Sequence, residues 1–357
     1  MLWFPMPATS HRTGFGADAD LTACRRALRG GSHTFYAASL ILPESVRGPA
    51  SALYAFCRSA DDAIDMAADP QSALAGLRVR LARAYSGEPV DDPADRAFAA
   101  TVSRFAIPRE IPEALLEGFA WDSGGRRYAD IDALCGYGAR VAGTVGVMMA
   151  LVMGVRAPEA LARACELGIA MQLTNIARDV GEDARLGRIY LPLDWLREAD
   201  IDPDAWLAAP FHDARLATVV RRLLAESDRL YARGAAGIAR LPAGCRPAIR
   251  AAARLYAEIG HEVARRGFDS VSGRAVVPTS RRLAVLGRAA VSGGGHPHSM
   301  SLPPIPAARF LVDAVARAGG RALPPRPAWW DFEARTVRII EMFERMSERD
   351  QLGGSRP

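Results

Sequence analysis

Residues 52–65 of the chain read ALYAFCRSADDAID, an apolar run that leads directly into three acidic residues. Because a helix rotates by about 100° per residue, Arg58, Asp61 and Asp65 would share one stripe along its surface. The apolar residues that precede this stripe favour a buried helix over an exposed one. The segment therefore predicts a helix that presents two carboxylates and a guanidinium on one face.

A second stretch, residues 167–183, repeats this arrangement with the sequence LGIAMQLTNIARDVGED. Carboxylates four residues apart on a helix repel each other by a few tenths of a kcal/mol, and a cation relieves this repulsion. Magnesium takes carboxylate, water and phosphate oxygens as its ligands. The alternative is that each acidic pair marks a solvated helix face, and either pair by itself leaves both interpretations open. The polar residues at the spacing of one stripe are Gln172, Asn175, Asp179 and Asp183.

The composition excludes several classes of function. The chain has 357 residues, of which 50% are hydrophobic and 24% charged, as expected of a globular protein with one large or two ordinary domains. All 45 basic residues are arginine, which excludes lysine Schiff bases and Walker-type phosphate loops. A net charge of +5 fits a polyanionic substrate or an anionic membrane surface. The arginines are scattered along the chain, so we expect no binding of nucleic acid.

The cysteines and the N-terminus bear on location. The five cysteines form no CxxC pair, which indicates a reduced, cytoplasmic protein. The first residues show no secretory signal, and the longest apolar stretch, residues 141–155, is too short for a comfortable membrane span. Peripheral contact with the inner face of the cell membrane is a further hypothesis, motivated by the basic charge.

The distribution of apolar residues and prolines predicts an all-α fold. A stretch rich in glycine and proline, residues 291–306, is interpreted as a linker that separates a domain over 20–290 from a C-terminal helical extension over 307–357. We expect the last helix of the extension to pack on the main domain or on a partner, because its acids nearly balance its arginines; the alternative is attachment to a membrane. The predicted helices cover residues 45–67, 71–86, 109–123, 130–154, 157–184, 213–240, 245–268, 307–318 and 331–348.

Several segments, which follow one another along the chain in the same order as in the family, resemble the squalene and phytoene synthase family. Within that family, they resemble the bacterial phytoene synthases most. The resemblance covers roughly residues 28–290. It rests on five groups of residues: Ser32-His33-Thr34-Phe35-Tyr36, residues 54–65, Tyr137 with residues 141–146, residues 172–183, and Tyr190-Leu191-Pro192 together with residues 256–260.

The resemblance implies an isoprenoid-synthase helical bundle in which the two aspartate helices face each other across a central cavity. It implies that Asp61, Asp65, Asn175, Asp179 and Asp183 hold Mg²⁺ or Mn²⁺, and that the four aspartates act in catalysis together with Tyr190. The substrate-binding residues that it implies are Ser32, Thr34, Phe35, Tyr36, Arg58, Tyr137, Val141, Gly143, Gly146, Gln172, Asn175, Arg178, Tyr256 and Arg274.

Several of these residues also have plain structural interpretations. Ser32 is also suited to cap the start of a helix. Arg58 and Arg178 are suited to ion pairs with the adjacent aspartates. The tyrosines Tyr137, Tyr190 and Tyr256 are suited either to cation-π stabilisation of a carbocation or to ordinary core packing.

The activity that the resemblance implies is a prenyl transfer in carotenoid biosynthesis. Two geranylgeranyl diphosphates would condense head to head through prephytoene diphosphate and lose two diphosphates to give 15-cis-phytoene, without NADPH. The alternatives are a dehydrosqualene or squalene synthase that uses two farnesyl diphosphates, and a non-catalytic assembly factor of the same fold. Contact with other enzymes of the carotenoid pathway is a further expectation.

Overall fold

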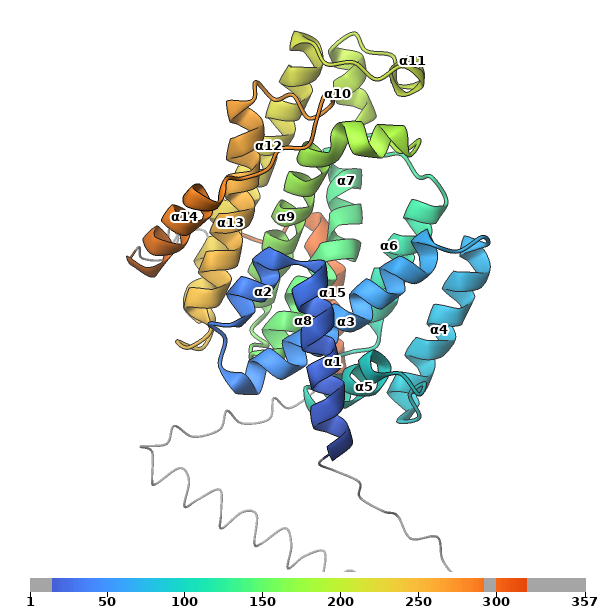
Figure 1. Cartoon of the computed structure of the whole chain (residues 1–357), viewed down its shortest axis with the longest axis vertical. Coiled ribbons are helices and arrows are strands. Elements are labelled where there is room, and N and C mark those ends of the chain that lie inside the picture. The colour runs from blue at the N-terminus through green and yellow to red at the C-terminus, as the bar shows by residue number, and fades with distance from the viewer. Residues whose placement is uncertain (1–14, 292–299, 320–357) are drawn as a thin grey trace, which may run out of the picture. The chain divides into compact units, whose positions relative to one another are not determined.

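The computed structural model describes residues 15–291 and 300–319, and every regular element within these ranges is a helix (Figure 1), which confirms the all-α fold. In chain order the elements are α1 (Phe15–Gly31), α2 (His33–Ser39), α3 (Glu44–Asp65), α4 (Pro70–Ser86), α5 (Pro93–Arg104), α6 (Glu110–Ser123), α7 (Ile131–Gly138), the π-helix η1 (Ala139–Gly143), α8 (Thr144–Val152), α9 (Pro158–Arg185), α10 (Leu193–Glu198), α11 (Pro203–Ala208), α12 (Ala214–Gly237), the 3₁₀-helix η2 (Ile238–Arg240), α13 (Arg246–Arg265), α14 (Thr279–Val291) and α15 (Pro306–Ala318).

Capping residues in the sequence fix where many of these helices begin. The carboxylate of Asp92 accepts hydrogen bonds from backbone N–H groups in the first turn of α5, and Pro93 follows it at a position where no N–H is needed. Asp130 and Asp213 cap α7 and α12 in the same way. At the other end of α4, Gly87 adopts a φ of +81°, a conformation that glycine tolerates at a helix end. Local sequence therefore sets these boundaries.

The 28-residue helix α9 is the centre of the body, and it packs against α12, α8, α13 and η1. Most of its residues from Ala160 to Gly181 are buried, which matches the apolar run seen in the sequence. Helix α3 packs against α1, α5 and α8. Because α3 and α9 carry the two acidic stretches at their C-terminal ends, the packing of the bundle decides where those stretches meet.

The long helices were predicted well, with one internal difference. The segment expected as a single helix over 130–154 is divided into α7, η1 and α8, because one turn takes the wider π form. A π segment inside a helix is often associated with a functional site. The helices that the sequence did not predict are α1, α2, α5, α10, α11 and α14. Three of these have only six or seven residues, and helices that short form through tertiary packing more than through their own propensity.

Helix α15, in the expected C-terminal extension, packs against α9, α7 and α6 and buries Leu311 and Val315. A buried charge cluster fixes the segment before it. Glu166 on α9 accepts hydrogen bonds from Arg163 at 3.0 Å and from Arg233 of α12 at 2.8 Å, and the two guanidinium groups also donate to the carbonyl of Pro303. The predicted helix over 331–348 and residues 292–299 of the expected linker lie outside the described residues.

One described run, Ile131–Val152, is long and apolar enough to cross a membrane by length and composition, with 61% of its most apolar window buried inside the protein. This run is α7, η1 and α8, which pack against α9. It is therefore a core segment of the helical body.

Candidate active site

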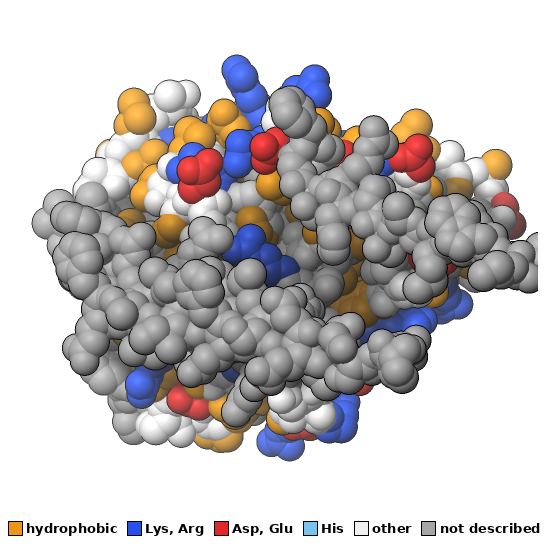
Figure 2. Space-filling view, turned by 90° about the horizontal axis from the view of Figure 1, so that it is seen from below, with side chains coloured by type: hydrophobic (Ala, Val, Ile, Leu, Met, Phe, Trp, Pro, Cys, Tyr) orange, Lys and Arg blue, Asp and Glu red, His pale blue; other side chains and the backbone are white. Residues whose placement is uncertain are grey.

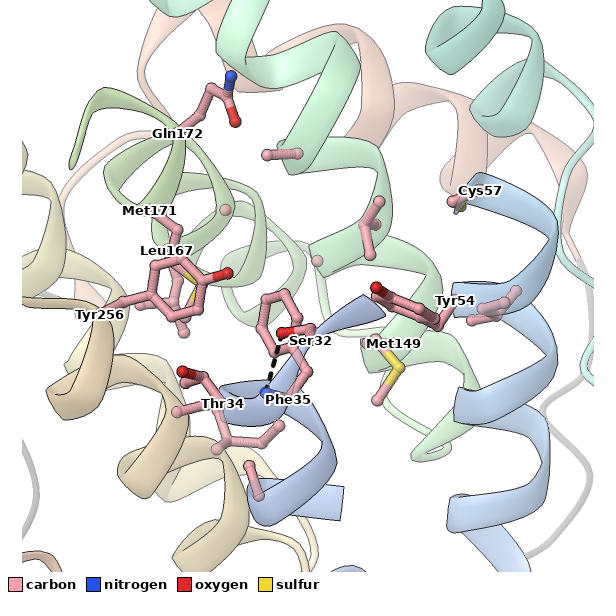
Figure 3. Close-up of a pocket in the computed structure, with 18 of the residues that line it drawn as sticks. Ser32, Thr34, Phe35, Tyr54, Cys57, Met149, Leu167, Met171, Gln172 and Tyr256 are labelled. Atoms are coloured by element: carbon pink, nitrogen blue, oxygen red, sulfur yellow. Dashed lines mark hydrogen bonds between the residues drawn. The ribbon is translucent and has the colours of Figure 1, made fainter. Parts of the chain in front are cut away.

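A cavity of about 660 Å³ lies between α2, α3, α8, α9 and α13 (Figure 3). Its lining changes character along the two acidic helices. On α3 the lining residues run from Ala50 and Leu53 to Asp61, and on α9 they run from Ala160 to Asn175 and Arg178. The cavity is therefore apolar over most of its length and polar where the two helices end. The predicted site residues that line it are Ser32, Thr34, Phe35, Arg58, Asp61, Tyr137, Val141, Gly146, Gln172, Asn175, Arg178, Tyr256 and Arg274.

The first acidic stretch reaches the cavity through Asp61, whereas Asp65 is exposed beyond it. Arg58 forms its close ion pair with Asp62 at 2.6 Å and lies 3.9 Å from Asp61. Burial raises the pKa of Asp61, and the negative charge of Asp65 raises it further while Arg58 opposes the shift. Asp61 therefore lacks a close cationic partner of its own.

In the second acidic stretch, too, one aspartate is paired with arginine and another is not. Arg178 holds Asp179 with two hydrogen bonds of 2.7 and 2.5 Å, and Arg274 adds a third contact at 2.9 Å. Burial raises the pKa of Asp183 to about 7, and the neighbouring charge of Asp179 contributes to this shift. Asp183, like Asp61, is thus a carboxylate whose negative charge the protein compensates incompletely.

Arg188 connects the two stretches. It follows α9 in the chain, and its guanidinium donates to Asp65 at 3.3 Å. Its positive charge also lowers the pKa values of Asp61 and Asp183, although burial outweighs it at both residues. Because one guanidinium acts on carboxylates of both stretches, the two acidic helix ends face each other at the polar end of the cavity.

The residues at this end fit a hard divalent cation. The side-chain oxygen Oδ1 of Asn175 is buried and has no hydrogen-bond partner within the described residues. A buried acceptor without a donor is costly, and a cation would satisfy it. Together with the carboxylates of Asp61 and Asp183 it gives an all-oxygen donor set, which suits Mg²⁺ or Mn²⁺. Among the described residues no three His, Cys, Asp or Glu side chains converge closely enough to bind a metal by themselves, so phosphate and water oxygens would have to complete the ligand set.

A carboxylate that the sequence did not predict, Asp122 at the end of α6, joins two of the predicted tyrosines. It accepts hydrogen bonds from the hydroxyl groups of Tyr137 at 2.7 Å and Tyr190 at 2.8 Å. The two tyrosine rings stack with their centroids 5.4 Å apart, and Tyr128 packs beside both. Burial raises the pKa of Asp122 to about 6, although both hydroxyl groups favour the charged form. These contacts hold the tyrosine rings in fixed positions. Asp122 and Tyr137 line the cavity, whereas Tyr190 is not among its lining residues.

Helix α2 supplies another wall. The backbone N–H of Phe35 donates to Ser32 Oγ at 3.3 Å, so Ser32 is the cap of α2 and also lines the cavity. The ring of Phe35 stacks on Tyr256 of α13, with centroids 5.0 Å apart. In Figure 3, Ser32, Phe35 and Tyr256 lie together on one side of the cavity, opposite Tyr54 and Met149. Tyr36 differs from the expectation, since its ring lies against the guanidinium of Arg29, 5.9 Å away, and not along the cavity.

The two predicted glycines serve helix packing. A Cβ atom at Gly143 would lie 2.6 Å from Cys165 Sγ, and one at Gly146 would lie 2.3 Å from the carbonyl oxygen of Ala164. These glycines therefore allow η1 and α8 to approach α9 closely. Gly146 also lines the cavity, whereas Gly143 packs against α9 and has no place in the lining.

Three residues near the site were not predicted from the sequence: Asp122, Arg188 and Tyr54. Asp122 stands at the end of an apolar helix without any motif, so no local signal marks it. Arg188 is two residues before Tyr190, and that proximity was the only available hint. Tyr54 lies in the quoted apolar run of α3 and lines the cavity, where its position four residues before Arg58 on the same helical face would have indicated it.

Comparisons with known proteins agree with this geometry. The sequence profile of a family described as Squalene/phytoene synthase matches residues 28–282. The chain is 51% identical to a phytoene synthase from Cereibacter sphaeroides over 354 residues, which cover 94% of this chain and 98% of the relative. It is 41% identical to a 15-cis-phytoene synthase from a Paracoccus species, over 73% of this chain and 88% of that one. The crystal structure of a dehydrosqualene synthase in complex with a ligand superposes with a TM-score of 0.72 at 28% identity, covering 77% of this chain and 96% of the other.

Proposed function

Because the chain belongs to the squalene/phytoene synthase family, we propose that it condenses two molecules of geranylgeranyl diphosphate head to head and releases two diphosphates to give 15-cis-phytoene. The protein is a prenyltransferase of carotenoid biosynthesis. The similarity to phytoene synthases extends over nearly the whole chain, which supports this product over others of the family.

The observation that carries the proposal is the polarity of the cavity. Apolar side chains line most of it, and carboxylates, an amide oxygen and arginines gather at the end where α3 and α9 finish. An allylic diphosphate has the same division between a long hydrocarbon tail and a charged head. The cavity therefore suits this substrate class along its length.

We further propose that Mg²⁺ or Mn²⁺ is the cofactor, held by Asp61, Asp183 and Asn175 with Asp65 and Asp179 beside them. When bound, such an ion would neutralise the charge that develops on a departing diphosphate. The support lies in the raised pKa values of Asp61 and Asp183 and in the unsatisfied Asn175 oxygen. Each of these three groups gains from a nearby cation.

The protein's own residues have separate tasks in this scheme. Arg178 and Arg274 are close enough to the cavity to bind phosphate oxygens, and their contacts with Asp179 orient them. The stacked rings of Phe35 and Tyr256 present aromatic faces on which a carbocation is stabilised by about 0.5 to 2 kcal/mol. Apolar walls exclude water, which would otherwise trap the cation as an alcohol. The final step loses a proton to form a double bond, so no reductant is required.

The test is to incubate the purified protein with Mg²⁺ and either the C20 or the C15 diphosphate, without NADPH, and to identify the hydrocarbons formed. We expect phytoene from the C20 substrate. Turnover of the C15 substrate alone would refute the proposed chain length.

A second candidate function is the synthesis of dehydrosqualene from two farnesyl diphosphates. It is favoured by the structural similarity to a dehydrosqualene synthase, which has the same fold at 28% identity. The same incubation separates the two reactions. A non-catalytic assembly factor is disfavoured because both acidic stretches are intact, and contact with other carotenoid-pathway enzymes stays a prediction.

A further inference from the structure

We propose that two adjacent turns at one end of the cavity form a docking surface for an anionic lipid bilayer. The first turn joins α2 to α3 and exposes Leu40 and Ile41, with 53% and 48% of their surfaces accessible to solvent. The second, between η2 and α13, exposes Pro242 and Ala243. We call these four residues the apolar tip. Both turns lie on the lower left of the body in Figure 1.

The two turns are in direct contact. A Cβ atom added to Gly244 would lie 3.1 Å from the side chain of Pro43, so the second turn rests against the first. Figure 2 views the molecule from below, and where its side chains are coloured by type, hydrophobic, arginine and acidic side chains lie near one another. The apolar tip is therefore one continuous feature made from segments about 200 residues apart in the sequence.

The backbone of the first turn is suited to an apolar environment. The guanidinium of Arg47 donates hydrogen bonds to the carbonyl oxygens of Ser39, Leu40 and Leu42, at 3.0, 2.8 and 2.9 Å. The N–H groups of residues 40–42 donate to carbonyls of the preceding turn of chain. Backbone groups that enter lipid must be satisfied internally, and a solvent-exposed loop has no need of this because water would serve. The pattern therefore favours burial of the tip in lipid.

Charge in the chain segments that contain the two turns points to the kind of bilayer. Residues 21–43 and 239–257 contain seven arginines and no aspartate or glutamate, and Glu44 is the nearest acid in the sequence to the first turn. The arginines are Arg25, Arg26, Arg29, Arg240, Arg246, Arg250 and Arg254. Basic residues next to a membrane are attracted by anionic headgroups, so this surface fits a bilayer that contains them.

The opposite end of the cavity has exposed apolar residues but the wrong charge. Met66 and Leu186, exposed by 85% and 66%, follow the acidic stretches that end with Asp65 and Asp183. An anionic surface would repel these carboxylates. The charge distribution therefore selects the end at the apolar tip.

The inner sides of the same two turns line the cavity, since Ala38 and Leu42 on the first turn and Leu241 on the second are among its lining residues. If the proposed function holds, the product is a hydrocarbon without a polar head, and docking of the tip would place this end of the cavity next to lipid. Docking of the tip on the bilayer does not depend on that reaction.

The experiment measures binding of the full-length protein to sedimenting vesicles of phosphatidylcholine with about one-third phosphatidylglycerol. Burying two half-exposed aliphatic side chains contributes about 2 kcal/mol, so the double variant L40S/I41S should bind these vesicles about thirtyfold more weakly. Because Arg240 is exposed, Arg240→Gln should weaken binding about fivefold at low salt, and the loss should shrink as salt is added. Vesicles of phosphatidylcholine alone should bind the parent protein weakly.

The matched control is V79S/L283S, which removes two aliphatic side chains of similar exposure from α4 and α14 and should leave vesicle binding unchanged. Thermal unfolding confirms that both double variants are folded. Unchanged binding of L40S/I41S would overturn the proposal, as would equal binding of the parent to neutral vesicles. If M66S/L186S loses binding in its place, the membrane contacts the acidic end. If L40S/I41S instead converts a dimer to a monomer in sedimentation velocity, with vesicle binding intact, the tip is an interface between two copies of this chain.

Discussion

Replacing Asp122 by asparagine removes the partly buried carboxylate that joins Tyr137 and Tyr190. In the folded protein its pKa is raised from 3.8 to about 6, chiefly because burial penalises the charged form. A carboxylate with a raised pKa costs the folded state stability when it ionises, and the cost is relieved as the pH falls through that pKa. The amide of the Asp122→Asn variant would carry no such charge at any pH.

The size of the effect follows from the shift. The difference between about 6 and 3.8 is roughly two pKa units, and each unit is equivalent to 1.36 kcal/mol, so the full cost above neutral pH is about 3 kcal/mol. About half of this cost should be gone at pH 5, which lies between the unfolded and folded values. The parent should therefore lose about 1.5 kcal/mol relative to Asp122→Asn between pH 5 and pH 7.5.

The assay is urea unfolding of metal-free protein, followed by tryptophan fluorescence at both pH values. Subtracting the two proteins cancels the other titrating groups, which they share. Tyr190→Phe is the matched variant, because it removes one of the two hydroxyl groups that donate to the carboxylate of Asp122. The loss of unfolding free energy between pH 5 and pH 7.5 should therefore be larger in this variant than in the parent. A difference between parent and Asp122→Asn that stays constant with pH would refute the reasoning.

Three further predictions concern other parts of the molecule. Asp61→Asn or Asp183→Asn should lower turnover at least a hundredfold with the helical circular dichroism preserved, and survival of turnover in both would mean that these carboxylates are not the site. Gly146→Ala forces a methyl group against the carbonyl of Ala164, 2.3 Å away, and should lower stability by about 1 to 3 kcal/mol, seen as a lower thermal midpoint even without substrate. Glu166→Gln leaves two buried guanidinium groups without their counter-charge and should cost about 3 to 5 kcal/mol in urea unfolding, whereas a cost below 1 kcal/mol would show that the cluster is unimportant for stability.

The sequence predicted the long helices because their signals are local. The apolar spacing of residues 45–67 and 157–184 recurs within a few turns, and caps such as Asp130 and Asp213 act on the next three residues. The short helices α10 and α11 were not predicted, because a segment of six residues forms a stable helix only when it packs against the rest of the protein. The π-helix η1 could not be predicted either, since no residue pattern in the segment marks it. Gly143, at its end, packs closely against α9.

The candidate site was only partly visible in the sequence. The oxygen-bearing stripes of Asp61, Asn175 and Asp183 were predicted from helical spacing, and the structure places Asp61 and Asn175 in the cavity lining. The partners of the arginines were not predictable. Arg58 lies closer to Asp62 than to Asp61, and Arg274 contacts Asp179 from 95 residues away in the sequence.

By itself the sequence determined that this chain is helical, that two helices end in carboxylates, and that arginine is its only strongly basic side chain. These properties follow from residue identity and from the repeat of 3.6 residues per turn, which acts over a few residues. Tertiary structure alone decided that the two acidic ends face each other, that Arg188 lies between them, and that Asp122 binds Tyr190, 68 residues away. The reason is physical: burial and Coulomb interactions depend on distance in space, and only the packing of α3, α6 and α9 brings these groups within a few ångströms of one another.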